Sequence, residues 1–255
     1  MTYTMSNNLE GKVAVITGAS RGLGKAMALA LAGAGAKLAL VARDREKLEE
    51  TAKLAAGLGS DAQVFIADVT DEAQVATMAQ LVVTQFGRVD ILINNAGVNI
   101  RKPLVEYSLE EWRKITDTNL TSVFLMCRAM IPHMKGRGYG RILNMTSIMS
   151  HVSLPGRTAY SASKAGVLGL TRSLAQELAP EGITVVGISP GPFATEMNTV
   201  LMANPEVNQQ FMSNTPLNRW GKVEEIGSLA LFLCGDGGAY ITGTDLLIDG
   251  GWTAR

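Results

Sequence analysis

The sequence predicts an α/β protein in which a doubly wound parallel sheet of about seven strands is flanked by helices on both faces. Two observations predict this fold class. Short apolar runs alternate with longer helical patterns along the whole chain, and no linker, repeat or break in composition interrupts them. Strands and helices that alternate at this spacing form parallel sheets through right-handed crossovers. We therefore expect one domain over residues 1–255, with a polar tail at residues 1–8.

Each expected strand is a short, mainly apolar run. Runs of this length are typical of strands that are buried on both faces of a sheet. In chain order they are Lys12–Thr17, Lys37–Ala42, Gln63–Ala67, Ile91–Asn94, Arg141–Met145, Thr184–Ile188 and Asp245–Ile248.

Helical patterns fill the intervals between these strands. Asp71 and Ser108 precede two of them and are followed by acidic residues, so we expect both to be N-caps. Pro180 and Gly182 end the fifth helix. The expected helices are near Gly22–Ala34, Asp44–Leu58, Asp71–Phe86, Leu109–Met134, Thr158–Ala179 and Val223–Cys234.

The stretch from Pro190 to Gly221 is the irregular part of the chain. It is rich in Asn, Pro and Met and precedes the last helix. Loops of that length are uncommon in compact domains and often serve as lids. We expect residues of about 190–221 to cover the substrate.

Composition and charge exclude several function classes. The 23 basic and 23 acidic residues balance and the aromatic content is 5%, which argues against a nucleic-acid groove or an anionic membrane as partner. Cys127 and Cys234 match no metal-binding spacing. The N-terminus lacks the apolar core of a signal peptide, and no apolar run reaches the roughly 18 residues of a membrane span. We expect a cytoplasmic protein without a metal.

A glycine-rich loop follows the first expected strand and opens the first helix, with the spacing G-x-x-x-G-x-G. Glycines allow the backbone to turn sharply and to approach a pyrophosphate, whose charge then faces the helix N-terminus. A glycine-rich turn without a ligand is the alternative, but the position in a β-α-β unit favours a dinucleotide. The candidate contacts are Gly18, Ser20, Arg21, Gly22, Leu23 and Gly24.

The end of the second strand distinguishes NADP from NAD. In doubly wound dinucleotide-binding folds an acidic residue about 20 residues after the loop holds the ribose hydroxyls of NAD, whereas here Ala42 has that position and Arg43 follows. A guanidinium matches a 2′-phosphate in charge and geometry, and Arg21 is placed to add a second cation. We predict NADP(H) as the cofactor. Asp44 and Glu46 leave NAD open as the alternative.

Tyr160 and Lys164 are four residues apart in an expected helix, thirteen residues after Ser147. Positions i and i+4 lie on one helix face, so we expect the ammonium of Lys164 to lower the pKa of the Tyr160 phenol. Such a phenol can pass a proton to and from a substrate oxygen, and the Ser147 hydroxyl can donate a hydrogen bond to the charge that develops there. The alternatives are a chance Tyr-x-x-x-Lys pattern and a serine that only caps a turn.

Six motifs occur in the order and spacing of one known family. They are TGxxxGxG at Thr17–Gly24, Asn94-Asn95-Ala96-Gly97, Asn119, Ser147, Tyr160-x-x-x-Lys164 and Pro190-Gly191. With these motifs the chain resembles the short-chain dehydrogenase/reductase family from about Leu9 to Arg255. The resemblance implies a Rossmann-type sheet, one dinucleotide-binding and catalytic domain, and an NAD(P)-dependent exchange between a secondary alcohol and a ketone.

The resemblance also implies roles for individual residues. Tyr160 would be the general acid/base, and Lys164 would lower its pKa and hold the nicotinamide ribose. Ser147 would bind the substrate oxygen, and Asn119 would hold a water that links Lys164 to solvent. Further cofactor contacts are implied for Asp68 and Val69 at the adenine, for Asn95, Ala96 and Gly97 at the adenosine ribose, and for Pro190, Gly191, Phe193 and Thr195 at the nicotinamide.

Several stretches resemble the sugar-acid dehydrogenases of this family, such as gluconate 5-dehydrogenase and 2-dehydro-3-deoxy-gluconate 5-dehydrogenase. They are Asn94–Pro103, Thr195-Glu196-Met197, Thr215–Gly221 and Asp249–Arg255. Arg101 follows the fourth strand at the expected mouth of the site, where a guanidinium can hold a carboxylate. His151 is a second candidate for a polar contact to the substrate. For both residues a solvated surface position is the alternative.

Two other functions stay open. The same motifs fit a 3-oxoacyl-carrier-protein reductase or a general ketone reductase; the former needs a basic patch for its acidic carrier, for which Arg128 and Arg172 are candidates. A non-catalytic NADP-binding regulator is less consistent with an intact Ser147, Tyr160 and Lys164. The resemblance further implies a homotetramer that acts on a small-molecule substrate, with no nucleic-acid or membrane partner.

Overall fold

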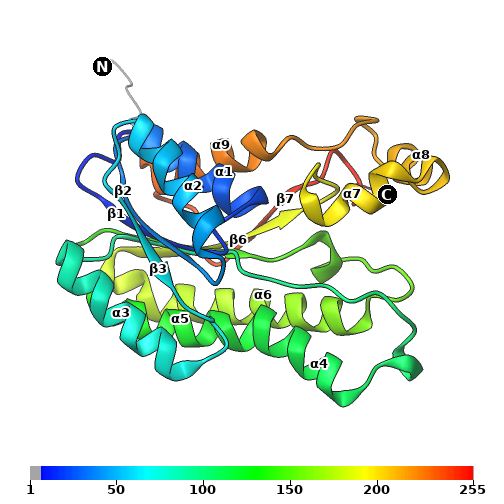
Figure 1. The fold of residues 1–255 in the computed structure, drawn as a ribbon, viewed down its shortest axis with the longest axis horizontal. Coiled ribbons are helices and arrows are strands. Elements are labelled where there is room, and N and C mark those ends of the chain that lie inside the picture. The colour runs from blue at the N-terminus through cyan, green and yellow to red at the C-terminus, as the bar shows by residue number, and fades with distance from the viewer. Residues whose placement is uncertain (1–6, 255) are drawn as a thin grey trace.

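A seven-stranded parallel sheet forms the centre of the molecule (Figure 1). The computed structural model describes residues 7–254, so most of the expected polar tail at 1–8 lies outside the described residues. The strand order is β3-β2-β1-β4-β5-β6-β7, and every neighbouring pair is parallel. The predicted fold class is confirmed: the strands run outward from β1 in one direction and from β4 in the other, which makes the sheet doubly wound.

The central strands are buried because their aliphatic side chains have helices on both sides. All residues of β1 and of β5 are buried. The predicted strands agree with the observed ones to within two residues at each end. The observed bounds are β1 Val13–Thr17, β2 Lys37–Ala42, β3 Ala62–Ile66, β4 Ile91–Asn94, β5 Gly140–Met145, β6 Ile183–Pro190 and β7 Asp245–Ile248.

Helices cover both faces of the sheet, and each face has its own apolar core. Met27, Leu31 and Leu40 belong to one core, and Val82 and Met126 belong to the other. On the first face lie α1 (Gly22–Gly33), α2 (Arg45–Gly57) and α9 (Val223–Cys234); on the second lie α3 (Glu72–Phe86), α4 (Leu109–Thr116), α5 (Ser122–Met130) and α6 (Thr158–Leu178) (Figure 1).

Both predicted N-caps are confirmed. Asp71 accepts hydrogen bonds from backbone amides in the first turn of α3. Ser108 and Glu111 bond each other's backbone amides at the start of α4, which is a reciprocal capping box. Short 3₁₀ turns complete the connections: η1 Leu104–Glu106, η3 Ile131–His133, η4 Ile148–Ser150, η5 Ala179–Glu181 and η7 Asp236–Gly238.

The predicted helix Leu109–Met134 is not a single regular α-helix. A π-helical turn, η2 (Asp117–Thr121), joins α4 to α5, and the amide of Ser122 bonds the carbonyl of Asp117. Such turns inserted into helices occur frequently at functional sites. Here the turn carries Asn119, which is fully buried.

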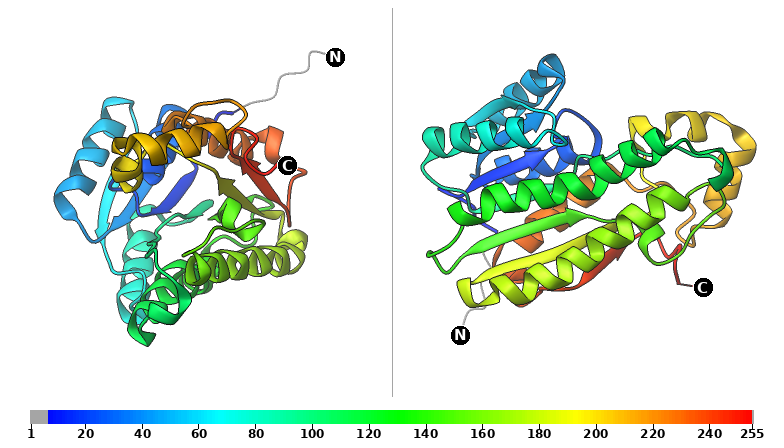
Figure 2. Two further views of the ribbon diagram at one scale, coloured as in Figure 1. Left: turned by 90° about the vertical axis from the view of Figure 1, so that its right-hand side faces the viewer. Right: turned by 90° about the horizontal axis from the view of Figure 1, so that it is seen from below.

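The interpretation of Pro190–Gly221 as irregular is wrong for its middle part. That part forms η6 (Glu196–Asn198), α7 (Thr199–Ala203) and α8 (Pro205–Ser213). Asn204 caps α8 with its side chain, and Pro205 occupies the first turn, where its missing N–H costs no hydrogen bond. Figure 2 shows this segment, in gold, beyond one end of the sheet.

None of the helices in residues 7–254 has the length and apolar character that a bilayer span requires. Within the same range, no three His, Cys, Asp or Glu side chains gather where they would hold a metal ion.

Candidate active site

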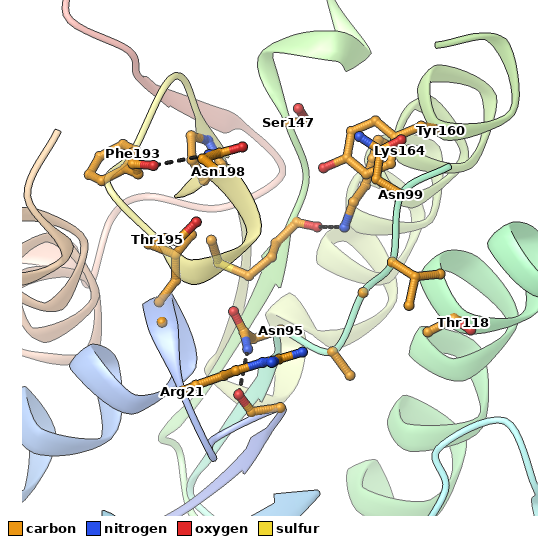
Figure 3. Close-up of a pocket in the computed structure, with 18 of the residues that line it drawn as sticks. Arg21, Asn95, Asn99, Thr118, Ser147, Tyr160, Lys164, Phe193, Thr195 and Asn198 are labelled. Atoms are coloured by element: carbon orange, nitrogen blue, oxygen red, sulfur yellow. Dashed lines mark hydrogen bonds between the residues drawn. The ribbon is translucent and has the colours of Figure 1, made fainter. Parts of the chain in front are cut away.

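A cleft opens at the carboxyl ends of the central strands and encloses about 940 Å³. It extends from the glycine loop past Ser147 and Tyr160 to the segment that carries α7 and α8 (Figure 3). In a doubly wound sheet, ligands bind at this edge, where the strand order reverses between β1 and β4. All predicted site residues line the cleft except Gly24, Asn119 and His151.

An asparagine at the end of β4 holds the glycine loop in place. Asn95 donates hydrogen bonds from its side-chain amide to the backbone oxygens of Thr17 and Gly18 at 2.9 and 3.1 Å. A Cβ atom on Gly24 would lie 2.3 Å from the oxygen of Gly18, so only glycine lets α1 pack this closely. Gly18 and Gly22 have φ angles of +64° and +54°, in the left-handed region that favours glycine.

The two arginines predicted to recognise a 2′-phosphate stand at the wall of the cleft, and both are paired with carboxylates. Arg43 contacts Asp68 at 3.3 Å, and Arg21 contacts Glu196 at 3.2 Å. The two guanidinium side chains are 74% and 60% exposed. Exposed ion pairs contribute only about 0–1 kcal/mol, so either arginine can exchange its carboxylate for a phosphate at small cost. Val69, also predicted at this end, is buried beside Asp68.

Tyr160, Lys164 and Ser147 come together in the cleft (Figure 3). Tyr160 and Lys164 project from the first turns of α6, and Ser147 follows β5. The Nζ atom of Lys164 donates to the backbone oxygen of Met145 at 2.6 Å, which ties α6 to the strand that leads into Ser147. The Ser147 hydroxyl accepts the amide of Met149 at 3.2 Å, and its own proton remains available for donation.

The pKa of Tyr160 is shifted in the direction opposite to the predicted one. Burial raises the pKa of Tyr160, while a hydrogen bond with Ser147 and the charges of Arg157 and Arg101 act to lower it. The Nζ of Lys164 lies 5.8 Å from the centroid of the Tyr160 ring and donates to the oxygen of Met145; its own lowering of the Tyr160 pKa stays a prediction. Burial lowers the pKa of Lys164 itself to about 8. The phenol is therefore protonated at neutral pH, which is the state that a proton donor needs.

Asn119 is fully buried in η2 and links the loop after β4 to α6. Its Oδ1 accepts the amide of Val98 at 2.8 Å, and its Nδ2 donates to the Val98 oxygen at 3.0 Å and to Ser163 Oγ at 3.1 Å. A Cβ atom on Gly97 would lie 3.3 Å from Asn119 Oδ1 and 3.7 Å from Lys164 Nζ, so this glycine keeps a gap open between them. Asn119 thus fixes the loop after β4 against α6. Its predicted binding of a water that links Lys164 to solvent stays a prediction.

The residues predicted at the nicotinamide lie at the end of β6 and directly after it, and they pack against other segments of the chain. A Cβ atom on Gly191 would lie 2.6 Å from the Cα of Asp249. The oxygen of Phe193 accepts the side-chain amide of Asn198 at 3.0 Å (Figure 3). Thr195 lies opposite the glycine loop, with its Cγ2 3.8 Å from the Cβ position of Gly22. Pro190 also lines the cleft.

His151 does not reach the cleft, contrary to the prediction that it contacts the substrate. Its Nε2 lies 2.6 Å from Oδ2 of Asp245, and His151 is not among the residues that line the cavity. The cause is the attraction of a buried carboxylate 94 residues away, which no local pattern in the sequence indicates.

Comparison with known proteins agrees with this arrangement. The family model described as Enoyl-(Acyl carrier protein) reductase matches residues 18–253. The gluconate 5-dehydrogenase of Gluconobacter oxydans is 38% identical over 246 residues, 96% of each chain. The 3-oxoacyl-(acyl-carrier-protein) reductase of Haemophilus influenzae is 39% identical over 243 residues, which cover 95% of this chain and 98% of that one. The chain belongs to the short-chain dehydrogenase/reductase family.

A solved structure supports the same assignment. The crystal structure of a gluconate 5-dehydrogenase from Burkholderia cenocepacia in complex with NADP and tartrate matches with a TM-score of 0.94 at 34% identity, covering 98% of both chains. As a short-chain dehydrogenase/reductase, the protein is an oxidoreductase that acts on CH–OH and keto groups. The relatives do not select one substrate, because two different activities are matched at nearly equal identity.

The cleft fits the nicotinamide nucleotide that this short-chain dehydrogenase/reductase would bind. No acidic residue stands in the first turn of α1, and no side chain caps it. The free backbone N–H groups of such a turn attract a pyrophosphate. A Cβ atom on Gly22 would meet nothing nearer than Thr195 at 3.8 Å, so this position leaves room for the pyrophosphate, whereas Gly18 allows the loop to pack against Asn95.

Sequence reasoning missed one residue of this site, Arg157. It is the N-cap residue of α6, three residues before Tyr160, and it lines the cleft together with Arg101. Burial and the charge of Arg101 lower the pKa of Arg157 to about 10, so the guanidinium is still charged at neutral pH. The spacing of three residues from Tyr160 in a helical pattern was the available signal.

Proposed function

We propose that this enzyme uses NADP(H) to interconvert a secondary alcohol and a ketone on a sugar acid or polyol, such as gluconate and 5-keto-gluconate. The observation that carries the proposal is a pair of arginines, Arg101 and Arg157, which share the cleft with Tyr160.

Two like charges without a counter-ion favour an anionic ligand. Within residues 7–254 the side chain of Arg157 forms no hydrogen bond or ion pair, although its backbone oxygen accepts the amide of Ser161. Arg101 donates to the neutral side chain of Asn198 at 3.4 Å. Burial lowers the pKa of both arginines, and the charge of Arg101 lowers that of Arg157 further. Such an arrangement is relieved when a negative charge joins it. A carboxylate fits, because a guanidinium binds it through two parallel hydrogen bonds.

The arginines lie close enough to Tyr160 to act on the same small molecule. Both charges lower the pKa of the Tyr160 phenol. A substrate whose carboxylate lies between the two guanidiniums therefore brings its other end towards the phenol. This places the carboxylate and the reacting oxygen on one compact molecule, as in a keto-sugar acid.

The proposed chemistry uses four side chains. Tyr160 gives its proton to the carbonyl oxygen during reduction and takes it back during oxidation. Ser147 donates a hydrogen bond to the same oxygen as charge develops there. Lys164 and Asn119 hold α6 against β5 and the loop after β4, and Lys164 is proposed to bind the nicotinamide ribose. The nucleotide supplies the hydride when it is bound.

NADP is proposed over NAD because Arg43 is an exposed cation beside Asp68, and Arg21 is a second exposed cation that lines the same cleft. The complex of the related gluconate 5-dehydrogenase with NADP supports this choice for the present chain.

A substrate screen tests the proposal. Initial rates with NADPH are measured for 5-keto-gluconate, for a neutral keto-sugar of the same length, and for acetoacetyl esters. We expect the sugar acid to have the highest kcat/KM, and Arg157→Met or Arg101→Met to raise its KM at least ~10-fold, as for loss of a charge-assisted contact of roughly 1.5–3 kcal/mol. The neutral keto-sugar should respond little to either change. Arg219→Met is the matched control, because Arg219 pairs with Glu225 outside the cleft.

One competing activity has an observation in its favour. The 39% identity to a 3-oxoacyl-(acyl-carrier-protein) reductase makes an acyl substrate the second candidate. Of the cations proposed to bind an acidic carrier, Arg128 is paired with the exposed Glu72, and such a pair opens at small cost, so Arg128 stays a candidate. A higher kcat/KM for the acetoacetyl ester than for the sugar acid would select it.

We further propose that the enzyme is a homotetramer. Support comes from apolar side chains that α4 and α5 leave exposed, such as Leu109 at 62% and Phe124 at 46%. Light scattering on the purified chain tests this, and a monomer mass would exclude it.

A further inference from the structure

One buried carboxylate beside the cleft has no part in the chemistry described above. Asp245 is the first residue of β7, and its side chain is 3% exposed. Gly187 of β6 is its partner in the sheet, and a Cβ atom on Gly187 would lie 2.3 Å from Asp245 Oδ1. The glycine therefore makes the space in which this acid is buried.

Three side chains surround the carboxylate. Thr146 donates to Oδ1 at 2.6 Å, and Ser189 donates to Oδ2 at 2.6 Å. His151 Nε2 lies 2.6 Å from Oδ2, and no other basic group within residues 7–254 pairs with Asp245. A buried ionised carboxylate is unfavourable unless it is paired and hydrogen-bonded. The three neighbours meet that requirement.

These neighbours belong to the segments that build the cleft. Thr146 directly precedes Ser147, and Ser189 directly precedes Pro190. His151 follows η4, the turn that begins at Ser147, and its amide bonds the oxygen of Ile148. Both ends of the segment 146–151 are thus attached to one carboxylate, with Ser147 between them.

We propose that Asp245 and His151 are positioning residues that fix where the Ser147 hydroxyl lies relative to the Tyr160 phenol. This inference rests on the role of Ser147 in the proposed function. Ser147 accepts the amide of Met149 within the turn, so a shift of the turn moves its hydroxyl. Misplacement of a catalytic group by about 1 Å can cost on the order of 10²-fold in rate.

Two substitutions of His151 separate positioning from simple packing. His151→Leu removes the donor to Asp245, whereas His151→Gln keeps an N–H that reaches the same carboxylate. We expect His151→Leu to lower kcat at least ~10-fold on whichever ketone the wild type reduces fastest. His151→Gln should restore kcat to within about threefold of wild type, and the KM for NADPH should stay within about twofold in both. Equal kcat values for wild type and His151→Leu overturn the proposal.

A double-mutant cycle tests whether the two residues act as one unit. Asp245→Asn keeps the volume of the side chain but removes its charge. If the pair acts together, the double variant loses no more kcat than the more damaging single variant. Independent, multiplicative losses overturn the proposal. Should Asp245→Asn fail to fold, the two His151 variants still decide the question, because His151 is 31% exposed and tolerates replacement more readily.

Hydrogen exchange provides a readout that does not depend on activity. The amides of Ser150 and His151 are bonded to Ser147 and Ile148, and His151→Leu should accelerate their exchange while α6 is unchanged. Unchanged exchange in this turn overturns the proposal.

Ser147→Ala separates the proposed role of Ser147 from the positioning role of His151 and Asp245. If it keeps full activity, the proposed role of Ser147 fails; if it is inactive while His151→Leu is normal, only the positioning role fails.

Discussion

The ammonium of Lys164 donates a hydrogen bond to the backbone oxygen of Met145, two residues before Ser147. This bond crosses from α6 to β5 and is 2.6 Å long. Lys164 is 4% exposed, and burial lowers its pKa from 10.5 to about 8. The same lysine therefore fastens two elements of the site together and carries a charge that the fold disfavours.

The buried Lys164 makes stability depend on pH in a defined direction. Below about pH 8 the folded and unfolded chains both hold the proton, so the fold carries the full cost of the buried charge. Between about 8 and 10.5 the folded chain has lost the proton and the unfolded chain keeps it, so stability rises with pH. Relative to Lys164→Met, the wild type should gain up to roughly 3 kcal/mol over this window. Urea unfolding at pH 7, 8, 9 and 10 measures the difference, and parallel curves for the two proteins would contradict it.

Replacement of the Tyr160 phenol should abolish turnover without loss of binding. Burial raises the pKa of Tyr160, so it holds its proton at neutral pH and can deliver it during reduction. Tyr160→Phe should lower kcat by about 10²–10⁴-fold, the usual value of positioned proton transfer, with little change in the KM for NADPH. Tyr107→Phe is the control, since its hydroxyl bonds the Ile100 oxygen and the residue does not line the cleft. Retention of more than about a tenth of the rate by Tyr160→Phe would exclude the acid/base role.

The choice of NADP over NAD should reside in Arg43 and Arg21. Neutralising Arg43 removes a cation but leaves the Asp68 carboxylate, whose charge then repels a 2′-phosphate. Arg43→Ala should raise the KM for NADPH about 10-fold or more and leave that for NADH nearly unchanged. Arg21→Ala should act in the same direction more weakly. Arg45→Ala, two residues after Arg43 in the chain and paired with Glu49, should change neither constant. A lower KM for NADH than for NADPH in the wild type would reverse the assignment.

Local signals in the sequence predicted most of the fold. The apolar runs identify every strand, and Asp71 and Ser108 mark helix starts because capping is a property of a few neighbouring residues. The same kind of signal was present at Asn204-Pro205, an N-cap followed by proline at the first helical position, but the polar composition of the segment concealed it.

What the sequence did not predict depends on contacts between distant residues. The bond from His151 to Asp245 spans 94 positions, and that from Thr146 to Asp245 spans 99. Such contacts arise only when β5, β6 and β7 are neighbours in the sheet. The pKa of Tyr160 was mispredicted for a related reason. Helical spacing shows that Lys164 is near, but not that the phenol is buried by segments distant in the sequence, which raises its pKa.

An aromatic stack should hold the segment with α7 and α8 over the substrate. Phe211 of α8 stacks on Trp220 at 5.4 Å between ring centroids and contacts Trp252 at 5.3 Å, and Phe211 and Trp252 both line the cleft. Each aromatic pair contributes about 0.5–1.5 kcal/mol beyond its buried area, so Phe211→Ala releases α8 from both tryptophans. The substrate KM should rise about 5–10-fold while the KM for NADPH stays within about twofold.

Tryptophan fluorescence provides an independent check of that release. In Phe211→Ala the emission of Trp220 and Trp252 should shift to the red as water reaches their rings, and added substrate should reverse less of the shift than in the wild type. Leu54→Ala, a change at an exposed position of α2, is the control and should alter neither the emission nor the substrate KM. An unchanged substrate KM in Phe211→Ala, with the emission shifted, would show that α8 does not cover the substrate.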